Sequence, residues 1–237
     1  GRFAPSPTGA LHFGSLVAAV ASYLEAITAG GGWLVRIEDL DTPRVVPGST
    51  DLILRTLETF GFEWTGPVVF QSQRTEAYSA ALAQLIKSGN AFYCSCSRSE
   101  ILAYRPATSV SDELFYPGWC REGVRNPDRT LAIRFRVPAG PIHFEDAIQG
   151  AISIDLATDC GDFVVRRRDG LFAYQLAVVV DDAAQDITHV VRGADLLSST
   201  PRQIALQRVL GFAHSMYAHV PLVIDNNGIK LSKSAGA

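Results

Sequence analysis

The chain has 237 residues, of which 47% are hydrophobic and 19% charged, and its formal net charge is −3. This composition predicts a globular protein with a substantial core, and its slight acidity excludes a generally basic nucleic-acid binder, so any contact with RNA or DNA must use a local patch. No apolar run has the length of a membrane span, no basic-then-apolar leader is visible, and four cysteines are too few for a disulfide framework. We therefore expect a cytoplasmic protein without a membrane partner.

The first 15 residues predict a strand, a turn and the start of a helix. Two prolines hold an extended segment, Gly9 interrupts it, and an amphipathic run begins at Gly14-Ser15. Loops of this kind in α/β folds hold phosphate groups. His12 lies in the turn, where its imidazole could meet a ligand close to the backbone. An ordinary loop with a surface histidine is the alternative.

A helix is expected next, because apolar residues recur at helical spacing from 16 to 27, and Gly30-Gly31-Gly32 ends it. Residues 33–37 form a buried strand that runs into Glu38-Asp39-Leu40-Asp41. Acidic residues at the carboxyl end of a parallel strand lie where open α/β sheets bind ligands, although a solvated loop would look the same.

Two further helices are expected over residues 49–60 and 74–88. Ser49 suits the N-cap of the first, and Gly61 and Gly89 suit the two ends. The order strand, helix, strand, helix, helix is that of the front half of a doubly wound α/β domain.

Cysteines dominate the next stretch. Cys94 and Cys96 are followed, after a polar loop, by Cys120. Three thiols in two clusters suit a structural zinc ion, which takes four ligands in a tetrahedron. No second Cys-x-x-Cys is present, so the fourth ligand could be Tyr116, Cys160, His143 or water. Buried free cysteines are the alternative.

The middle of the chain is rich in predicted strands, at 131–137, 151–155 and 163–165. We therefore predict an inserted subdomain at 93–165, between a first half of the α/β domain at 1–92 and a second half at 166–237. Arginines concentrate in and just after the insertion, which makes it a candidate surface for a phosphate backbone, with scattered solvated arginines as the alternative. They are Arg121, Arg125, Arg129, Arg134, Arg136, Arg166, Arg167 and Arg168.

The last third returns to an α/β pattern. A buried run covers 174–180, a strand covers 188–193, and a final strand is expected at 221–225. Thr200 and Gln203 fit a capping box, with Pro201 in the first position of a helix that ends before Gly211. A doubly cationic segment, Lys230-Leu231-Ser232-Lys233-Ser234, follows a turn.

This cationic segment and the opening loop form a pair. His12-Phe13-Gly14-Ser15 and Lys230-Leu231-Ser232-Lys233-Ser234 resemble the two motifs of class I aminoacyl-tRNA synthetases, in the same order and at opposite ends of a Rossmann-like pattern. The first motif of that family is usually His-Ile-Gly-His, so Ser15 replaces a second histidine. Either motif alone is weakly specific, whereas the ordered pair is a strong signal.

The resemblance narrows to the glutamyl branch of this family. The segment 2–9, the run Arg36-Ile37-Glu38-Asp39, Tyr174 and the runs 178–182 and 189–193 are similar to that branch. Within it, the segments 11–19 and 33–41 and the cysteine cluster resemble the glutamyl-queuosine tRNA(Asp) synthetases. The likeness covers essentially the whole chain.

The resemblance implies a Rossmann-like parallel sheet that binds nucleotide, with an inserted β-rich, zinc-bearing subdomain. It implies that ATP, accompanied by Mg²⁺, reacts with L-glutamate to give glutamyl-adenylate and pyrophosphate without needing tRNA. The glutamate would then pass to the queuosine base at the wobble position of tRNA(Asp). We expect the enzyme to be a monomer.

The resemblance also implies roles for individual residues. ATP would be bound by His12, Gly14, Ser15, Lys230 and Lys233, of which His12 and Lys233 would act in catalysis. Glutamate would be bound by Arg2, Ala4, Ser6, Glu38, Tyr174 and Arg192, with Glu38 on its ammonium group and the arginines on its carboxylates. Zinc would be bound by Cys94, Cys96, Tyr116 and Cys120.

Three other functions fit parts of the sequence. A catalytic core of an ordinary glutamyl-tRNA synthetase is the nearest, although the short insertion and the Leu-His-Phe-Gly-Ser motif count against it. A small-molecule adenylating ligase of the same fold would have no use for the cysteine cluster. A non-catalytic RNA-binding relative would not need His12, Glu38, Arg192 and Lys233.

Overall fold

A parallel sheet forms at the N-terminal end of the chain in a computed structural model, which describes residues 1–104 and 115–224. It has the order β1-β2-β3, from β1 (Arg2–Phe3), β2 (Leu34–Ile37) and β3 (Val69–Phe70). Helices α1 (Phe13–Thr28) and α2 (Ser49–Thr59) share a hydrophobic core with it. Trp33 is buried beside this sheet, with its ring edge-on to Tyr23 and stacked on Phe62.

A second sheet has the strand order β7-β6-β10-β9. Strands β9 (His189–Gly193), β10 (Met216–Val220) and β6 (Ile142–Asp146) run parallel, and β7 (Gly150–Ile154) closes the edge as the antiparallel arm of a hairpin. Helices α3 (Thr75–Lys87), α6 (Tyr174–Ala184) and α7 (Ser199–Leu210) pack with one another beside it. Because β1 also lies beside β9, the two sheets form one Rossmann-like parallel core.

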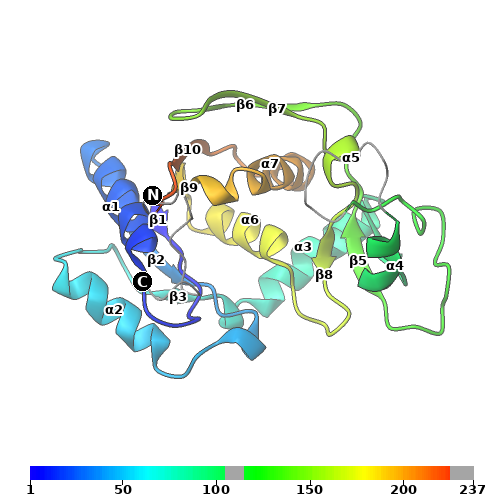
Figure 1. The fold of residues 1–237 in the computed structure, drawn as a ribbon, viewed down its shortest axis with the longest axis horizontal. Helices are drawn as coiled ribbons and strands as arrows, with labels where there is room; N and C mark the ends of the chain where they lie inside the picture. Colours follow the sequence, from blue (N-terminus) through cyan, green and yellow to red (C-terminus); the bar gives the residue numbers. More distant parts are fainter. Residues whose placement is uncertain (105–114, 225–237) are drawn as a thin grey trace.

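A third sheet is antiparallel and has the order β4-β5-β8, from β4 (Ala91–Cys94), β5 (Ala132–Phe135) and β8 (Val164–Arg166). Short helices α4 (Arg98–Ala103) and α5 (Leu156–Asp159) lie near it, at the right of Figure 1. The hairpin β6–β7 extends from this end along the top of the view toward β10 (Figure 1). Three single-turn 3₁₀ helices lie at Thr42–Arg44, Gln71–Gln73 and Ala194–Leu196.

The predicted stretch 93–165 therefore contains strands of two different sheets. Its strand β5 pairs with β4 and β8, whereas its strand β6 pairs with β10 of the Rossmann-like core, through Asp146 and Tyr217. The boundaries of the insertion stay a prediction.

Several expected elements differ from those observed. The buried run at 174–180 lies in helix α6, which is buried on almost every side and therefore shows no amphipathic period. The final strand lies earlier than expected, at Met216–Val220, where Tyr217 and His219 alternate inward; Asp225 of the expected strand lies outside the described residues.

The two expected helix caps are also wrong. Helix α7 begins one residue before Thr200, and Thr200 and Gln203 hydrogen-bond to side chains of other elements instead of capping it. The N-cap of α2 is Gly48 in a left-handed conformation, while the Ser49 hydroxyl donates to the carbonyl of Pro7 at 2.6 Å. Gly211 ends α7 as expected, with φ of 73°.

Among the described helices, none combines the length and the apolar character needed to cross a membrane.

Candidate functional site

A cleft of about 330 Å³ opens where the strands β1, β2, β9 and β10 end. The residues that follow these strands line it, and the first turn of α1 closes one side. Ligands of open α/β sheets bind at this carboxyl edge, and the volume suits a small molecule.

The cleft brings together the residues that the sequence assigned to two different ligands. All six predicted glutamate-binding residues line it: Arg2, Ala4, Ser6, Glu38, Tyr174 and Arg192. Three of the predicted ATP-binding residues, His12, Gly14 and Ser15, line the same cleft. The other two, Lys230 and Lys233, lie outside the described residues.

The start of α1 presents donors to the cleft. His12 is the N-cap, and its Nδ1 accepts a hydrogen bond from the backbone N–H of Ser15 at 3.3 Å. A neutral ring that accepts at Nδ1 carries its proton on Nε2. A Cβ atom on Gly14 would lie 3.1 Å from the ring, so glycine at this position lets the imidazole fold over the helix start. The helix dipole adds a partial positive charge here.

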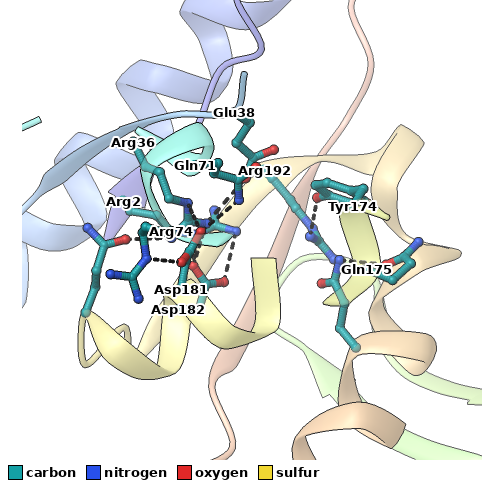
Figure 2. A network of polar contacts seen from close by, with 12 residues as sticks. Arg2, Arg36, Glu38, Gln71, Arg74, Tyr174, Gln175, Asp181, Asp182 and Arg192 are labelled. Carbon is teal, nitrogen blue, oxygen red and sulfur yellow. Dashed lines mark hydrogen bonds and ion pairs between the residues drawn. The ribbon is translucent and has the colours of Figure 1, made fainter. Parts of the chain in front are cut away.

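Ion pairs hold the wall formed by β1 and β2 (Figure 2). Arg2 donates to both oxygens of Asp182, at 3.1 and 3.3 Å, and Nη2 of Arg36 lies 2.7 Å from Asp182 and 3.4 Å from Glu38. Burial opposes ionisation of Asp182, but Arg2 and Arg36 hold its pKa below the ordinary value. Burial raises the pKa of Glu38, although Arg36 opposes the shift. A cationic ligand group beside Glu38 would therefore stabilise its charged form.

Asp181 extends the same network behind the cleft. It accepts from Gln71 at 2.9 Å and also pairs with Arg74 (Figure 2). It accepts as well from the Tyr78 hydroxyl at 2.7 Å. The network as a whole contains three arginines and three carboxylates, so its charges balance: Arg2, Arg36, Arg74, Glu38, Asp181 and Asp182.

The opposite wall, formed by β9 and α6, is different. Arg192 donates to the Tyr174 hydroxyl at 3.1 Å, to Thr200 Oγ1 at 2.8 Å and to His219 Nε2 at 3.0 Å. Within the part of the chain that the structure describes, no carboxylate reaches Arg192. Its positive charge is therefore available to an anionic ligand group. The sequence identified Arg192 and Tyr174, but not Thr200 and His219, which hold the arginine from behind.

The predicted cysteine cluster forms. The sulfur atoms of Cys94, Cys96 and Cys120 lie within 4.8 Å of one another, and all three residues are buried. The Tyr116 hydroxyl lies 3.4 Å from the sulfur of Cys94 and 3.9 Å from that of Cys96. Cys160, an alternative fourth ligand, instead directs its thiol toward the carbonyls of Leu156 and Gly161, and His143 is exposed on β6.

Ionisation within this cluster is uneven. Burial and the neighbouring Cys120 raise the pKa of Cys96 to about 12. Burial also opposes ionisation of Cys120, but backbone N–H groups of Arg125 and Ser95 outweigh it and lower its pKa to about 6. The guanidinium of Arg134 donates to Cys94 at 3.3 Å and lies 3.9 Å from the centre of the Tyr116 ring. The cluster could therefore hold a metal ion.

The arginines proposed as a phosphate surface are mostly engaged within the protein. Arg121 is paired with Asp162, Arg129 with Glu100 and Arg136 with Glu122, while Arg167 contacts Asp41 and Asp169. The charges of these four are therefore partly compensated within the protein, whereas Arg125, Arg134, Arg166 and Arg168 contact a ring, a thiol or carbonyl groups. The phosphate surface stays a prediction.

Known proteins resemble the chain along its whole length. The family model described as the catalytic domain of class I tRNA synthetases (E and Q) matches residues 1–237. A protein of Geobacter sulfurreducens named glutamyl-Q tRNA(Asp) synthetase is 60% identical, over 100% of this chain and 76% of its own length. A protein of Dechloromonas aromatica with the same name is 59% identical, over 100% of this chain and 79% of its own length.

Solved structures agree with these relatives. The crystal structure of a glutamate tRNA ligase from Elizabethkingia meningosepticum, in complex with its amino acid, superimposes with a TM-score of 0.84 and 32% identity. The match covers 99% of this chain and 52% of that ligase, so the chain spans about half the length of the solved protein. The chain therefore belongs to the class I tRNA synthetases of the E and Q type and, within them, to the family of ligases named glutamyl-Q tRNA(Asp) synthetase.

Proposed function

We propose that this enzyme activates glutamate with ATP, without needing tRNA, and transfers it to the queuosine base at the wobble position of tRNA(Asp). The proposal that glutamate is the amino-acid substrate rests on one observation: the two walls of the cleft present side chains of opposite charge. Glu38 offers a buried carboxylate to an ammonium group, while Arg192, which has no carboxylate partner in residues 1–104 and 115–224, offers its guanidinium to a carboxylate. The name shared by the relatives supports tRNA(Asp) as the acceptor.

The first chemical step is an attack of the glutamate α-carboxylate on the α-phosphorus of ATP. A bond forms between the carboxylate oxygen and phosphorus, the bond to the β-phosphate oxygen breaks, and pyrophosphate leaves. Catalysis of this kind needs positioning and positive charge more than a protein nucleophile. His12 and the helix start at Gly14 and Ser15 would bind phosphate oxygens.

The cationic loop would supply the remaining charge. We assign Lys230 to the bound ATP and Lys233 to the negative charge that develops on the leaving pyrophosphate. Mg²⁺ would accompany ATP and shield its phosphates. In the second step a hydroxyl of the queuosine ring attacks the activated carbonyl, its proton is lost, and AMP leaves.

The decisive experiment measures labelled glutamate on tRNA(Asp) with and without queuosine, and on tRNA(Glu). We expect labelling only of the queuosine-containing tRNA(Asp). Equal labelling of both forms of tRNA(Asp), or labelling of tRNA(Glu), would replace the proposal with an ordinary glutamyl-tRNA synthetase.

The activation step is tested separately by ATP–pyrophosphate exchange without RNA. We expect exchange that depends on glutamate. A requirement for tRNA would favour an ordinary synthetase, and the absence of exchange with any amino acid would favour a binding protein.

We also propose that the cysteine cluster binds one structural Zn²⁺ through Cys94, Cys96, Cys120 and Tyr116. Ligands at about 2.3 Å (sulfur) and about 2.0 Å (oxygen) from a tetrahedral zinc lie roughly 3.5–3.8 Å apart. The Cys96–Cys120 sulfur separation of 3.6 Å falls in this range, and the separations of the Tyr116 hydroxyl from the sulfur atoms of Cys94 (3.4 Å) and Cys96 (3.9 Å) lie just outside it. Arg134 would offset the negative charge of three thiolates.

Metal analysis tests this site. The purified protein should contain about one equivalent of zinc, Cys94→Ser should lose it, and Cys160→Ser should keep it, because the thiol of Cys160 faces backbone carbonyls instead. A protein with much less than one equivalent, or loss of zinc from Cys160→Ser alone, would contradict the assignment.

A further inference from the structure

Arg192 is held by a set of neutral partners that leaves little of its guanidinium free. Nε donates to His219, Nη2 donates to Thr200 Oγ1 and to the carbonyl of Leu196, and Nη1 donates to Tyr174. A guanidinium has five N–H groups, and these contacts use four of them. The second N–H on Nη1 has no partner among the residues that the structure describes, and it lies with the Tyr174 hydroxyl in the lining of the cleft.

His219 can accept from Arg192 only in one of its two neutral forms. Its Nδ1 lies 2.5 Å from Oδ2 of Asp146, and an ionised carboxylate only accepts hydrogen bonds, so the proton is on Nδ1. Nε2 then carries the lone pair that Arg192 Nε requires. Asp146, His219 and Arg192 are 3%, 0% and 5% exposed, so water cannot replace these partners.

Asp146 is itself fixed by the turn of the hairpin β6–β7. Its Oδ1 accepts from the backbone N–H groups of Ile148 at 3.1 Å, Gln149 at 2.9 Å and His219 at 3.1 Å. These three bonds orient the carboxylate so that Oδ2 meets the imidazole. The hairpin turn therefore orients Asp146, Asp146 fixes the tautomer of His219, and His219 fixes the orientation of the Arg192 guanidinium.

We infer that Asp146 and His219 are positioning residues for the amino-acid substrate: they fix the plane of Arg192 so that its remaining Nη1–H and the Tyr174 hydroxyl meet a carboxylate of glutamate. The inference rests on the proposed function for the identity of that ligand. Neither residue touches the cleft.

The ionisation of His219 is consistent with this role. Burial lowers its pKa, the hydrogen bond to Asp146 opposes the shift, and the charge of Arg192 adds to it. A neutral ring is needed, because an imidazolium would point an N–H at the guanidinium.

Two substitutions at position 219 separate positioning from packing. His219→Asn keeps a donor near the place of Nδ1 and loses the acceptor for Arg192, whereas His219→Gln places an amide oxygen near the place of Nε2. We expect His219→Asn to weaken glutamate binding at least about tenfold and His219→Gln to weaken it less, with the KM for ATP unchanged in both. Glutamate binding is measured by calorimetry and the KM values by ATP–pyrophosphate exchange.

Asp146→Asn tests the tautomer directly. Because three backbone donors hold Oδ1, the new amide nitrogen faces the imidazole, which must then carry its proton on Nε2. We expect a loss of glutamate affinity similar to that of His219→Asn. The control is His143→Asn, which changes an exposed histidine on the same strand and should leave both constants unchanged.

The ¹⁵N spectrum of histidine in the unmodified protein supplies a test that needs no stable variant. His219 should show the Nδ1–H tautomer, and an Nε2–H tautomer would overturn the inference. The inference would also be overturned if folded His219→Asn and Asp146→Asn variants bound glutamate with an affinity within twofold of that of the parent protein. The same holds if the KM for ATP rose by as much as glutamate binding weakened. If the parent protein binds no glutamate, the proposed function itself fails.

Discussion

The two walls of the cleft each present an arginine, but they hold it in opposite ways. Arg2 is paired with Asp182 in a network of balanced charges, whereas Arg192 has only neutral partners among the described residues. A balanced network stabilises the wall, and Glu38, the carboxylate of this network that lines the cleft, can also contact a cation there. The neutral setting of Arg192 keeps a full positive charge for the ligand. The difference shows how one cleft can orient a molecule that carries both charges.

The largest expected effect comes from breaking the balanced wall. Asp182→Asn leaves Arg2 and Arg36 buried with reduced compensation, and should lower the free energy of unfolding by about 3–5 kcal/mol, measured by denaturant titration. Glu63→Gln, at an exposed position, should change it by less than about 0.5 kcal/mol. An equal, small change in both variants would show that the ion pairs contribute little.

Asp182 also predicts how stability depends on pH. Its pKa is lower in the folded protein than in the unfolded chain, so its contribution is complete above the unfolded value of about 3.9 and is lost as the pH falls through the folded value. Asp182→Asn should remove this part of the acid transition.

Conservative replacement of each arginine sharpens the comparison. Lysine lacks the planar guanidinium with its five N–H donors. Arg192→Lys should therefore leave the acceptors on His219, Tyr174 and Thr200 without their donors and weaken glutamate binding about 100-fold. Arg2→Lys keeps a cation beside Asp182 and should weaken binding about tenfold. Calorimetric titration with glutamate measures both, and equal losses would mean that the two walls do not differ in kind.

Glu38 offers a test of the cationic side. Because burial raises its pKa, acidification should protonate Glu38 at a higher pH than an ordinary glutamate, and the KM for glutamate should rise as the pH falls through that value. Glu38→Gln should raise the KM about tenfold at neutral pH and abolish this dependence. The KM for glutamate is measured by ATP–pyrophosphate exchange as a function of pH in the parent protein and in Glu38→Gln. If the variant keeps the pH dependence of the parent protein, another group is responsible for it.

The smallest effect is expected at the start of α1, where the phosphates of ATP are proposed to bind and which belongs to neither wall. Gly14→Ala places a Cβ atom about 3.1 Å from the His12 ring and should displace it. We expect the KM for ATP to rise a few-fold, about 1 kcal/mol or less in binding, while the KM for glutamate stays constant. A larger effect on glutamate than on ATP would contradict the separation of the two subsites.

The sequence predicts the lining of the cleft well, for a topological reason. Residues that follow parallel strands meet at one edge of the sheet, so the segments after residues 3, 37 and 193 converge whatever the details of packing. Helix α3 is predictable for a local reason too, because its apolar face is the buried one. Helix α1 lies where its apolar spacing predicts it, but Val20, Leu24 and Ile27 of that spacing are exposed.

Long-range partnerships were not predictable. Asp146 and His219 are 73 positions apart, and no local pattern connects them. Thr200 and Gln203 fit a capping box in the sequence, yet Thr200 accepts from Arg192 and Gln203 donates to Gln175, because tertiary contacts outweighed local helix capping. Helix α6 was not identifiable by periodicity, since seven of its eleven residues are buried.

The pairing of β6 with β10 has a consequence for how the chain folds during synthesis. The hairpin β6–β7 can form as soon as residue 154 has emerged, but the free edge of β6 must wait for β10, which ends at residue 220, 66 residues later. At ribosomal rates of about 5–20 residues per second this delay lasts roughly 3–13 s. An unpaired strand edge is a site of aggregation during such an interval. The contacts that support Arg192 are thus among the last to form, and the nascent protein depends on them for closing its sheet.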